Sequence, residues 1–119
     1  MAGHLTTHVL DISASIPAQG LTIELWRLSS TSDRTHVKTV VTNDDGRVDN
    51  PLLADNDMQQ GTYELVFHVG DYFKRRNVTS DHPPFLNDVP VRFNVADSDA
   101  HYHVPLLVAP GGYSTYRGS

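Results

Sequence analysis

Closely spaced histidines are the side chains in this sequence best able to do chemistry. The chain holds seven histidines, and two of them, His101 and His103, lie two residues apart. On a β-strand both would point to the same face, about 7 Å apart along the chain. Such a pair can be an acid–base pair, a metal site or an exposed pair without a role, and the spacing alone leaves all three open.

A metal site would need a third ligand, which His8 could supply, because His-x-His on a strand with a third histidine can bind zinc. No neighbouring residue has matching spacing, however, and an arginine converging on the same site, such as Arg47, would repel a dication. The absence of cysteine excludes thiolate ligands, thiol nucleophiles and disulfides. The sequence also lacks a Gly-x-Ser-x-Gly nucleophile motif and a glycine-rich phosphate loop.

Composition and charge exclude further classes of function. Nine basic and fourteen acidic residues give a net charge of −5 without a basic stripe, which argues against nucleic acid as a partner. No apolar run approaches the roughly 20 residues of a membrane helix. The first residues lack the features of a signal peptide, and the last three are not a peroxisomal address, so we expect a cytoplasmic protein.

Short β-strands must position the histidines. Alternating apolar residues or β-branched residues predict strands over 5–11, 21–28, 37–42, 62–69, 89–95, 101–108 and 113–117. Asp44-Asp45-Gly46 and Pro110-Gly111-Gly112 are predicted turns, and residues 71–76 are the only candidate for a helix. We therefore expect residues 1–119 to form a single all-β domain, an antiparallel β-sandwich of seven to eight strands with one short helix.

Four stretches, taken in order, resemble one known family. Residues 113–119, Tyr-Ser-Thr-Tyr-Arg-Gly-Ser, are similar to the C-terminal signature of the 5-hydroxyisourate hydrolases, transthyretin-related enzymes of purine breakdown. Residues 5–11 resemble that family's N-terminal strand, residues 101–107 its penultimate strand and residues 70–73 a mid-chain segment. The loop over residues 13–18 departs from the Gly-Lys or Gly-Arg that usually precedes Pro-Ala, and we expect this to alter loop shape rather than activity.

The resemblance implies a transthyretin-like fold and hydrolysis of 5-hydroxyisourate to 2-oxo-4-hydroxy-4-carboxy-5-ureidoimidazoline in urate degradation. It further implies a homotetramer, a dimer of dimers with sites at the dimer–dimer interface, and no metal or organic cofactor. The residues that it places at or near the site are His8, Arg47, His101, His103, Tyr116 and Ser119.

Roles for these residues follow from the same resemblance. His8 with His103 would handle the attacking water, assisted by His101, while Arg47 would hold the oxyanion and keep its histidine neighbours neutral. Tyr116 and Ser119 would contact the substrate. The alternatives are a transthyretin-like carrier without catalysis and an interaction module. A carrier channel should be apolar, whereas this one would present His8, Arg47 and His103. An interaction module would give no reason for an ordered C-terminal end.

Overall fold

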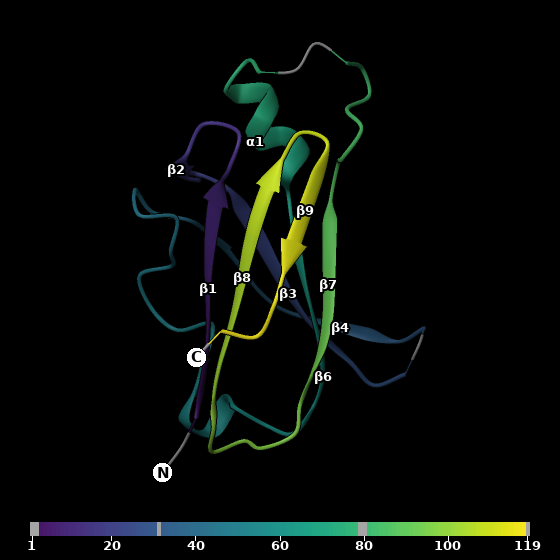
Figure 1. Cartoon of the computed structure of the whole chain (residues 1–119). Coiled ribbons are helices and arrows are strands. Elements are labelled where there is room, and N and C mark those ends of the chain that lie inside the picture. The colour runs from purple at the N-terminus through teal and green to yellow at the C-terminus, as the bar shows by residue number, and fades with distance from the viewer. Residues whose placement is uncertain (1–2, 31, 79–80, 119) are drawn as a thin grey trace.

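Two β-sheets pack face to face in the computed structural model, which describes residues 3–30, 32–78 and 81–118 (Figure 1). One sheet has the order β2-β1-β8-β9, with β5 also pairing with β1, and the other has the order β4-β3-β6-β7. The strands are β1 (His4–Asp11), β2 (Ile16–Pro17), β3 (Thr22–Leu28), β4 (Arg34–Val41), β5 (Leu53–Ala54), β6 (Gly61–Phe67), β7 (Val89–Val95), β8 (His101–Ala109) and β9 (Gly112–Thr115).

The predicted β-sandwich is therefore confirmed, and most of the predicted strands are shifted by only a few residues. The short strands β2 and β5 were not predicted, because two residues are too few to show an alternating pattern. The helix α1 (Val69–Arg75) begins two residues before the predicted start and is followed by Arg76 as its cap. A 3₁₀ turn at Asp55–Asp57 follows β5.

One strand pairing differs from the antiparallel sandwich that the sequence predicted. β1 and β8 are parallel, with His4 opposite His101, Thr6 opposite His103 and His8 opposite Pro105. All other pairings among the described strands are antiparallel. The parallel register matters for function, because it aligns the polar positions of an N-terminal strand with those of a C-terminal strand.

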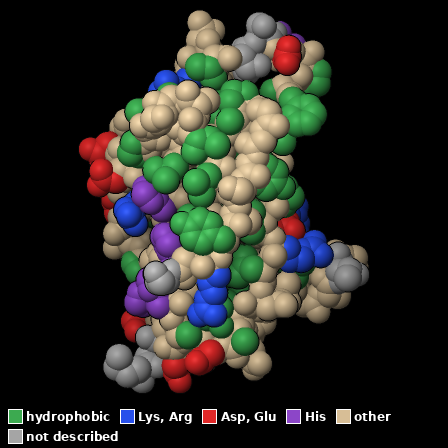
Figure 2. All heavy atoms as spheres, in the orientation of Figure 1, with side chains coloured by type: hydrophobic (Ala, Val, Ile, Leu, Met, Phe, Trp, Pro, Cys, Tyr) green, Lys and Arg blue, Asp and Glu red, His purple; other side chains and the backbone are tan. Residues whose placement is uncertain are grey.

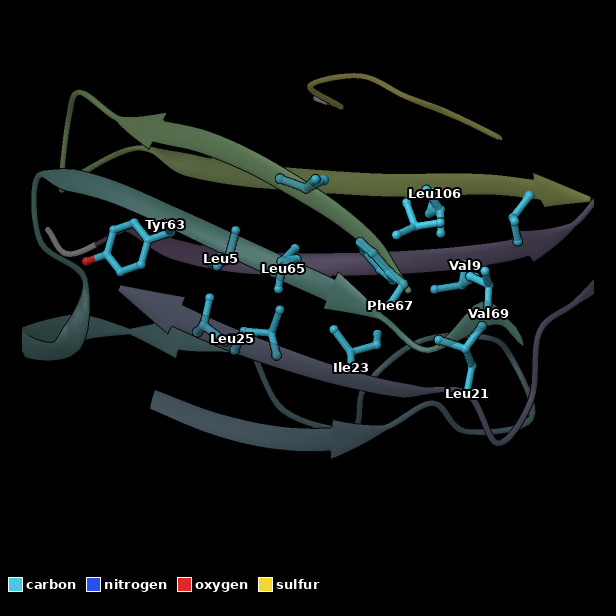
Figure 3. Packing of buried hydrophobic residues seen from close by; sticks show 14 of the residues in the cluster. Leu5, Val9, Leu21, Ile23, Leu25, Tyr63, Leu65, Phe67, Val69 and Leu106 are labelled. Carbon is cyan, nitrogen blue, oxygen red and sulfur yellow. The ribbon is translucent and has the colours of Figure 1, made fainter. Parts of the chain in front are cut away.

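Alternate residues of β1 and β8 build the hydrophobic core. Leu5, Val9 and Leu106 are fully buried against Ile23 and Phe67 of the opposite sheet, as Figure 3 shows. Burying one such side chain contributes about 1.5–3 kcal/mol. Because the inner residues of both strands are fixed in this way, the outer residues between them stand on a rigid surface.

The loop over residues 13–18 folds back as a short hairpin. Ile16 pairs with Asp11, and Pro17 pairs with Leu10. Ser15 takes a left-handed conformation at φ 58°, which closes the hairpin. No helix within the described ranges is long and apolar enough to cross a membrane.

Candidate active site

The outer face of the β1–β8 pair carries the histidines that the sequence analysis singled out. Strand alternation that buries Leu5 and Val9 leaves His4, Thr6 and His8 half-exposed on the other side of β1. The parallel register sets His101 and His103 of β8 beside them. Figure 2 shows histidine side chains gathered on this face, with a basic side chain beside them.

A turn from a distant part of the chain brings Arg47 to His8. The two residues form an isolated antiparallel bridge, and Nε2 of His8 lies 2.9 Å from the carbonyl oxygen of Asp45. A carbonyl only accepts hydrogen bonds, so Nε2 of His8 must donate. In the neutral ring the lone pair is then on Nδ1, which makes Nδ1 the nitrogen able to accept a proton.

The turn that carries Arg47 is locked by the side chain of Asn43 and by a glycine. The Oδ1 atom of Asn43 accepts from the backbone N–H groups of Asp45 at 2.9 Å and Arg47 at 3.1 Å. Gly46 has φ +75°, and a Cβ there would lie 2.3 Å from the carbonyl oxygen of Val9. The predicted turn is thus confirmed, and only glycine allows it to approach β1 this closely.

A threonine hydroxyl links the two histidines of β8. Thr6 Oγ1 lies 2.9 Å from Nε2 of His101 and 2.8 Å from Nδ1 of His103. The ring of His101 is also 4.1 Å from that of His4, centroid to centroid. The histidines therefore form a connected polar row rather than a set of isolated surface groups.

Three of these histidines have lowered pKa values. Partial burial and the positive charge of Arg47 lower the pKa of His8, against the opposing effect of the Asp45 contact. Burial, Arg47 and the neighbouring imidazoles of His101 and His8 lower the pKa of His103. The pKa of His101 is lowered by burial, His4 and Arg117. The lowered pKa values favour the neutral form of each ring, which can accept a proton.

The C-terminal segment crosses the same face after β9 (Figure 1). The N–H of Gly118 donates to the carbonyl oxygen of His103 at 2.7 Å. A Cβ at Gly118 would lie 2.6 Å from Cδ2 of His103, so glycine is needed for this close approach. Arg117 donates to the carbonyl oxygen of His101 at 3.3 Å and stacks 4.1 Å from the ring of Tyr102.

The structure thus brings together His8, Arg47, His101 and His103, the four residues predicted to be catalytic. Tyr116 is 59% exposed and lines a cavity of about 330 Å³ with Phe93 of β7 and Thr115 of β9, so it lies at the open edge of the sandwich. Ser119 lies outside the described residues. Among those described, no group of three or more histidine, cysteine or acidic side chains is arranged to hold a metal ion.

Three further residues belong to the site but were not predicted from the sequence: Thr6, Asn43 and Gly118. Thr6 shares the outer face of β1 with His8, so strand alternation places it near the site, but nothing in the sequence shows that β8 lies alongside. Asn43 immediately precedes the predicted turn and fits the usual role of asparagine in turns. Gly118 belongs to the terminal motif, but only the structure shows that its backbone lies so close to His103 that a side chain would not fit.

Comparison with known proteins now identifies the family. Residues 5–118 match the HIUase/Transthyretin family, and the chain belongs to it. A 5-hydroxyisourate hydrolase of Halalkalibacterium halodurans is 56% identical over 100% of both chains. 5-hydroxyisourate hydrolase 2 of Rhizobium meliloti is 57% identical over 99% of this chain and 98% of its own.

Solved structures agree with the fold. The 5-hydroxyisourate hydrolase of Klebsiella pneumoniae superposes with a TM-score of 0.81 at 34% identity, over 98% of this chain and 99% of that one. An (S)-allantoin synthase superposes with a TM-score of 0.93 at 44% identity, but this chain covers only 44% of it. Sea bream transthyretin, at 24% identity and a TM-score of 0.85, shares the fold.

Proposed function

We propose that this protein hydrolyses 5-hydroxyisourate to 2-oxo-4-hydroxy-4-carboxy-5-ureidoimidazoline on the outer face of the β1–β8 pair. The observation that supports this most strongly is the convergence of His8 and His103, both with lowered pKa values, beside Arg47. A neutral base next to a fixed cation can activate water and stabilise the oxyanion that forms when it attacks a carbonyl. Close relatives that bear the hydrolase name support the substrate.

The chemistry divides into water activation and oxyanion stabilisation. A neutral imidazole of the His8–His103 pair takes a proton from water, and the resulting hydroxide attacks a ring carbonyl carbon. The guanidinium of Arg47 holds the oxygen as it becomes negative. The ring C–N bond then breaks, the nitrogen takes the proton back from the imidazolium, and the product gains its carboxylate and ureido groups.

Arg47 has a second effect in this scheme. Its charge is among the causes that lower the pKa of His8 and of His103. The same guanidinium that stabilises the oxyanion therefore keeps the two bases unprotonated before the reaction. A histidine base, a water molecule and an arginine suffice for these steps, so the proposal needs no metal or organic cofactor.

We further propose that the site is completed in a homotetramer, a dimer of dimers. Arg47 and His101 are exposed at the surface of the chain. The outer face of the sheet therefore supplies only one wall of a substrate-binding site. A second copy facing this wall would exclude water from the reacting groups, which strengthens their electrostatic interactions. Tyr116 and Ser119 are then proposed to contact the substrate from the C-terminal segment.

A carrier that binds without catalysis is the alternative. Transthyretin shares this fold, so the fold alone does not separate the two functions. The outer face here carries His8, His103 and the charged Arg47, which would have to lose water to receive an apolar ligand. The chemistry of the face therefore favours turnover of a polar substrate.

One assay tests the hydrolase directly. Urate oxidase generates 5-hydroxyisourate in situ, and its ultraviolet absorbance should decay faster in the presence of this protein, with or without EDTA. His36→Asn is a matched control, because His36 is an exposed histidine on β4 of the opposite sheet. Decay at the spontaneous rate would refute the hydrolase, and loss of activity with EDTA that zinc restores would refute the metal-free mechanism.

Assembly is tested separately. If the dimer–dimer contact completes the site, dilution or a substitution that yields stable dimers should abolish turnover while circular dichroism stays unchanged. Sedimentation measured on the same samples gives the size of the particle. Fully active dimers would show that the tetramer is not needed for the reaction.

A further inference from the structure

Thr6 occupies a position on the histidine face that the scheme above leaves without a role. Its side chain comes from the middle of β1, directly opposite His103 in the parallel register. Its Oγ1 atom lies within hydrogen-bond distance of two imidazole nitrogens, 2.9 Å from Nε2 of His101 and 2.8 Å from Nδ1 of His103. One hydroxyl therefore joins two rings that stand on the neighbouring strand.

A hydroxyl carries one proton, and this constrains both rings. Thr6 can donate to only one of the two nitrogens, so the other nitrogen must donate to Thr6 for both contacts to be hydrogen bonds. The ring that accepts from Thr6 has its lone pair there, whereas the ring that donates has its N–H there. His101 and His103 consequently take opposite roles toward Thr6, and the state of one ring fixes that of the other.

We infer that Thr6 is a positioning residue that sets the tautomers of His101 and His103 together and carries a proton from His103 to His101 during hydrolysis. This inference rests on the proposed function and deepens it, because it assigns His101 its assisting role. Thr6 contacts neither water nor substrate in this scheme. It acts through the two imidazoles.

The proton balance is as follows. Before reaction, Nδ1–H of His103 donates to Thr6, and Thr6 donates to Nε2 of His101, which leaves Nε2 of His103 free to accept a proton from water. Once it has done so, His103 is a cation. Its Nδ1 proton moves to the oxygen of Thr6 while the hydroxyl proton moves to Nε2 of His101. His103 becomes neutral, His101 becomes the cation, and no atom is gained or lost.

The difference in exposure between the two rings favours this transfer. Arg47 acts on His103 and opposes a positive charge there, as do the neighbouring rings of His8 and His101. His101 is the more exposed ring, and the groups that oppose its charge are His4 and Arg117. Each ring thus has an arginine that opposes its charge, and moving the cation to His101 places it on the ring with more contact with water. When the two relayed protons move back through Thr6, His103 is again the cation, and its Nε2 proton passes to the leaving nitrogen.

The adjacent Thr7 is a matched control within the same strand. Its hydroxyl points into the core and donates to the carbonyl oxygen of Val104 at 2.7 Å, with no histidine involved. Thr7 is 3% exposed, whereas Thr6 is half-exposed. The same substitution at the two positions therefore separates a proton-carrying hydroxyl from a structural one.

The experiment compares Thr6→Val, Thr6→Ala, Thr6→Ser and Thr7→Val in the full-length protein. Valine keeps the β-branched shape and removes the hydroxyl. Alanine also removes the hydroxyl and controls for any steric clash of the valine side chain. Serine keeps the hydroxyl and removes only the methyl group. The first readout is the ¹⁵N NMR tautomer pattern of His101 and His103, recorded without substrate. The second is kcat, KM and the pH profile of kcat/KM for 5-hydroxyisourate.

We expect Thr6→Val and Thr6→Ala to change the tautomer pattern of both rings and to lower kcat about 10- to 100-fold, an effect as large as that of losing the partner that orients a metal-ligating histidine. KM should change little, the acid limb of the pH profile should move, and Thr6→Ser should recover most of kcat. Thr7→Val should leave the tautomers, the pH profile and kcat unchanged.

Wild-type kcat and tautomers in Thr6→Val would overturn the inference. A lower kcat with unchanged tautomers and an unchanged pH profile would also overturn it, because that result shows a purely structural role. The NMR readout needs no substrate. A failure of the wild-type protein to hydrolyse 5-hydroxyisourate would therefore refute the proposed function while the coupling of the two rings is still measured.

Discussion

The two faces of β1 place similar polar residues in opposite situations. On the inner face, Thr7 and Asp11 are buried and their oxygens are bonded to other parts of the protein. On the outer face, Thr6 and His8 are half-exposed. Nε2 of His8 is bonded to the Asp45 carbonyl, whereas Nδ1 of the same ring can accept a proton. Neighbouring residues along one strand thus differ in whether their polar atoms are buried and bonded or accessible for chemistry.

The carboxylate of Asp11, on the inner face, is held by several partners. Its side chain accepts hydrogen bonds from the N–H of Ser13 at 3.0 Å and from the hydroxyl of Tyr72 at 2.9 Å, and it pairs with Arg76 at 3.5 Å. Burial and the Asp11 carboxylate raise the pKa of Tyr72 to about 12. Polar groups on the inner face therefore stabilise the fold, whereas those on the outer face are available for proton transfer.

The largest expected effect is on the outer face. His8→Asn and His103→Asn should each lower kcat at least about 10²-fold, since general base catalysis typically contributes 10²–10⁴. The double variant should be little worse than the poorer single variant, because we propose that the two rings work as a unit. Rates from the in-situ absorbance assay, together with circular dichroism, would test both statements.

The result that contradicts this account is a double variant that still turns over near the wild-type rate. That outcome would move the chemistry away from His8 and His103. Melting temperatures should stay close to that of the wild type, because both side chains lie outside the core.

Arg47→Ala should come next, with a loss of about 10²–10³ in kcat, the typical effect of removing one preorganised oxyanion donor. Arg47→Lys keeps the charge but lacks the planar fork, so it should recover little. Steady-state kinetics of both variants would measure the difference. Full recovery by lysine would mean that charge alone matters at this position.

A substitution on the inner face should produce the opposite pattern. Asp11→Asn loses the buried charge that Arg76 and the Tyr72 hydroxyl stabilise, and should reduce the free energy of unfolding by about 3 kcal/mol. Below its unfolding temperature the variant should keep kcat, because Asp11 does not reach the outer face. Urea titration and the hydrolysis assay would separate the two quantities. A loss of kcat without a loss of stability would show that the two faces are coupled.

The smallest effect concerns pH. Because the pKa values of His8 and His103 are lowered, the neutral bases persist below the ordinary histidine pKa of about 6.5, and kcat/KM should fall only below it. Arg47→Gln removes the charge that lowers both pKa values, so they should rise and the acid limb should move to higher pH. The profile of each variant is read relative to its own plateau. An unmoved limb in Arg47→Gln would show that Arg47 does not control these bases.

The sequence was sufficient to predict the strands longer than two residues and the faces of β1 and β8, because a two-residue period depends only on local chain geometry. It also predicted the turn before Arg47, since aspartate and glycine favour such conformations. Helix α1 starts earlier than predicted, because the local charge pattern begins only at Asp71, whereas the helix begins with the buried residues Val69 and Gly70.

The pairing of strands could not be derived from local pattern. Thr6 and His103 are 97 residues apart, and nothing near either one indicates a parallel neighbour. The same holds for the contact between Asp45 and His8, because a turn motif does not reveal which strand it approaches. The resemblance to a family supplied the four catalytic candidates, and only the three-dimensional arrangement added Thr6.

The parallel β1–β8 pair also has a consequence for how the protein is made. Its contacts join residues near the start of the chain to residues near the end, and pairings of such large sequence separation form slowly because their loop-closure entropy must be overcome first. During synthesis β1 has no parallel partner until β8 has been made. The row of histidines on the two strands therefore forms only after residues 101–109 have been synthesised.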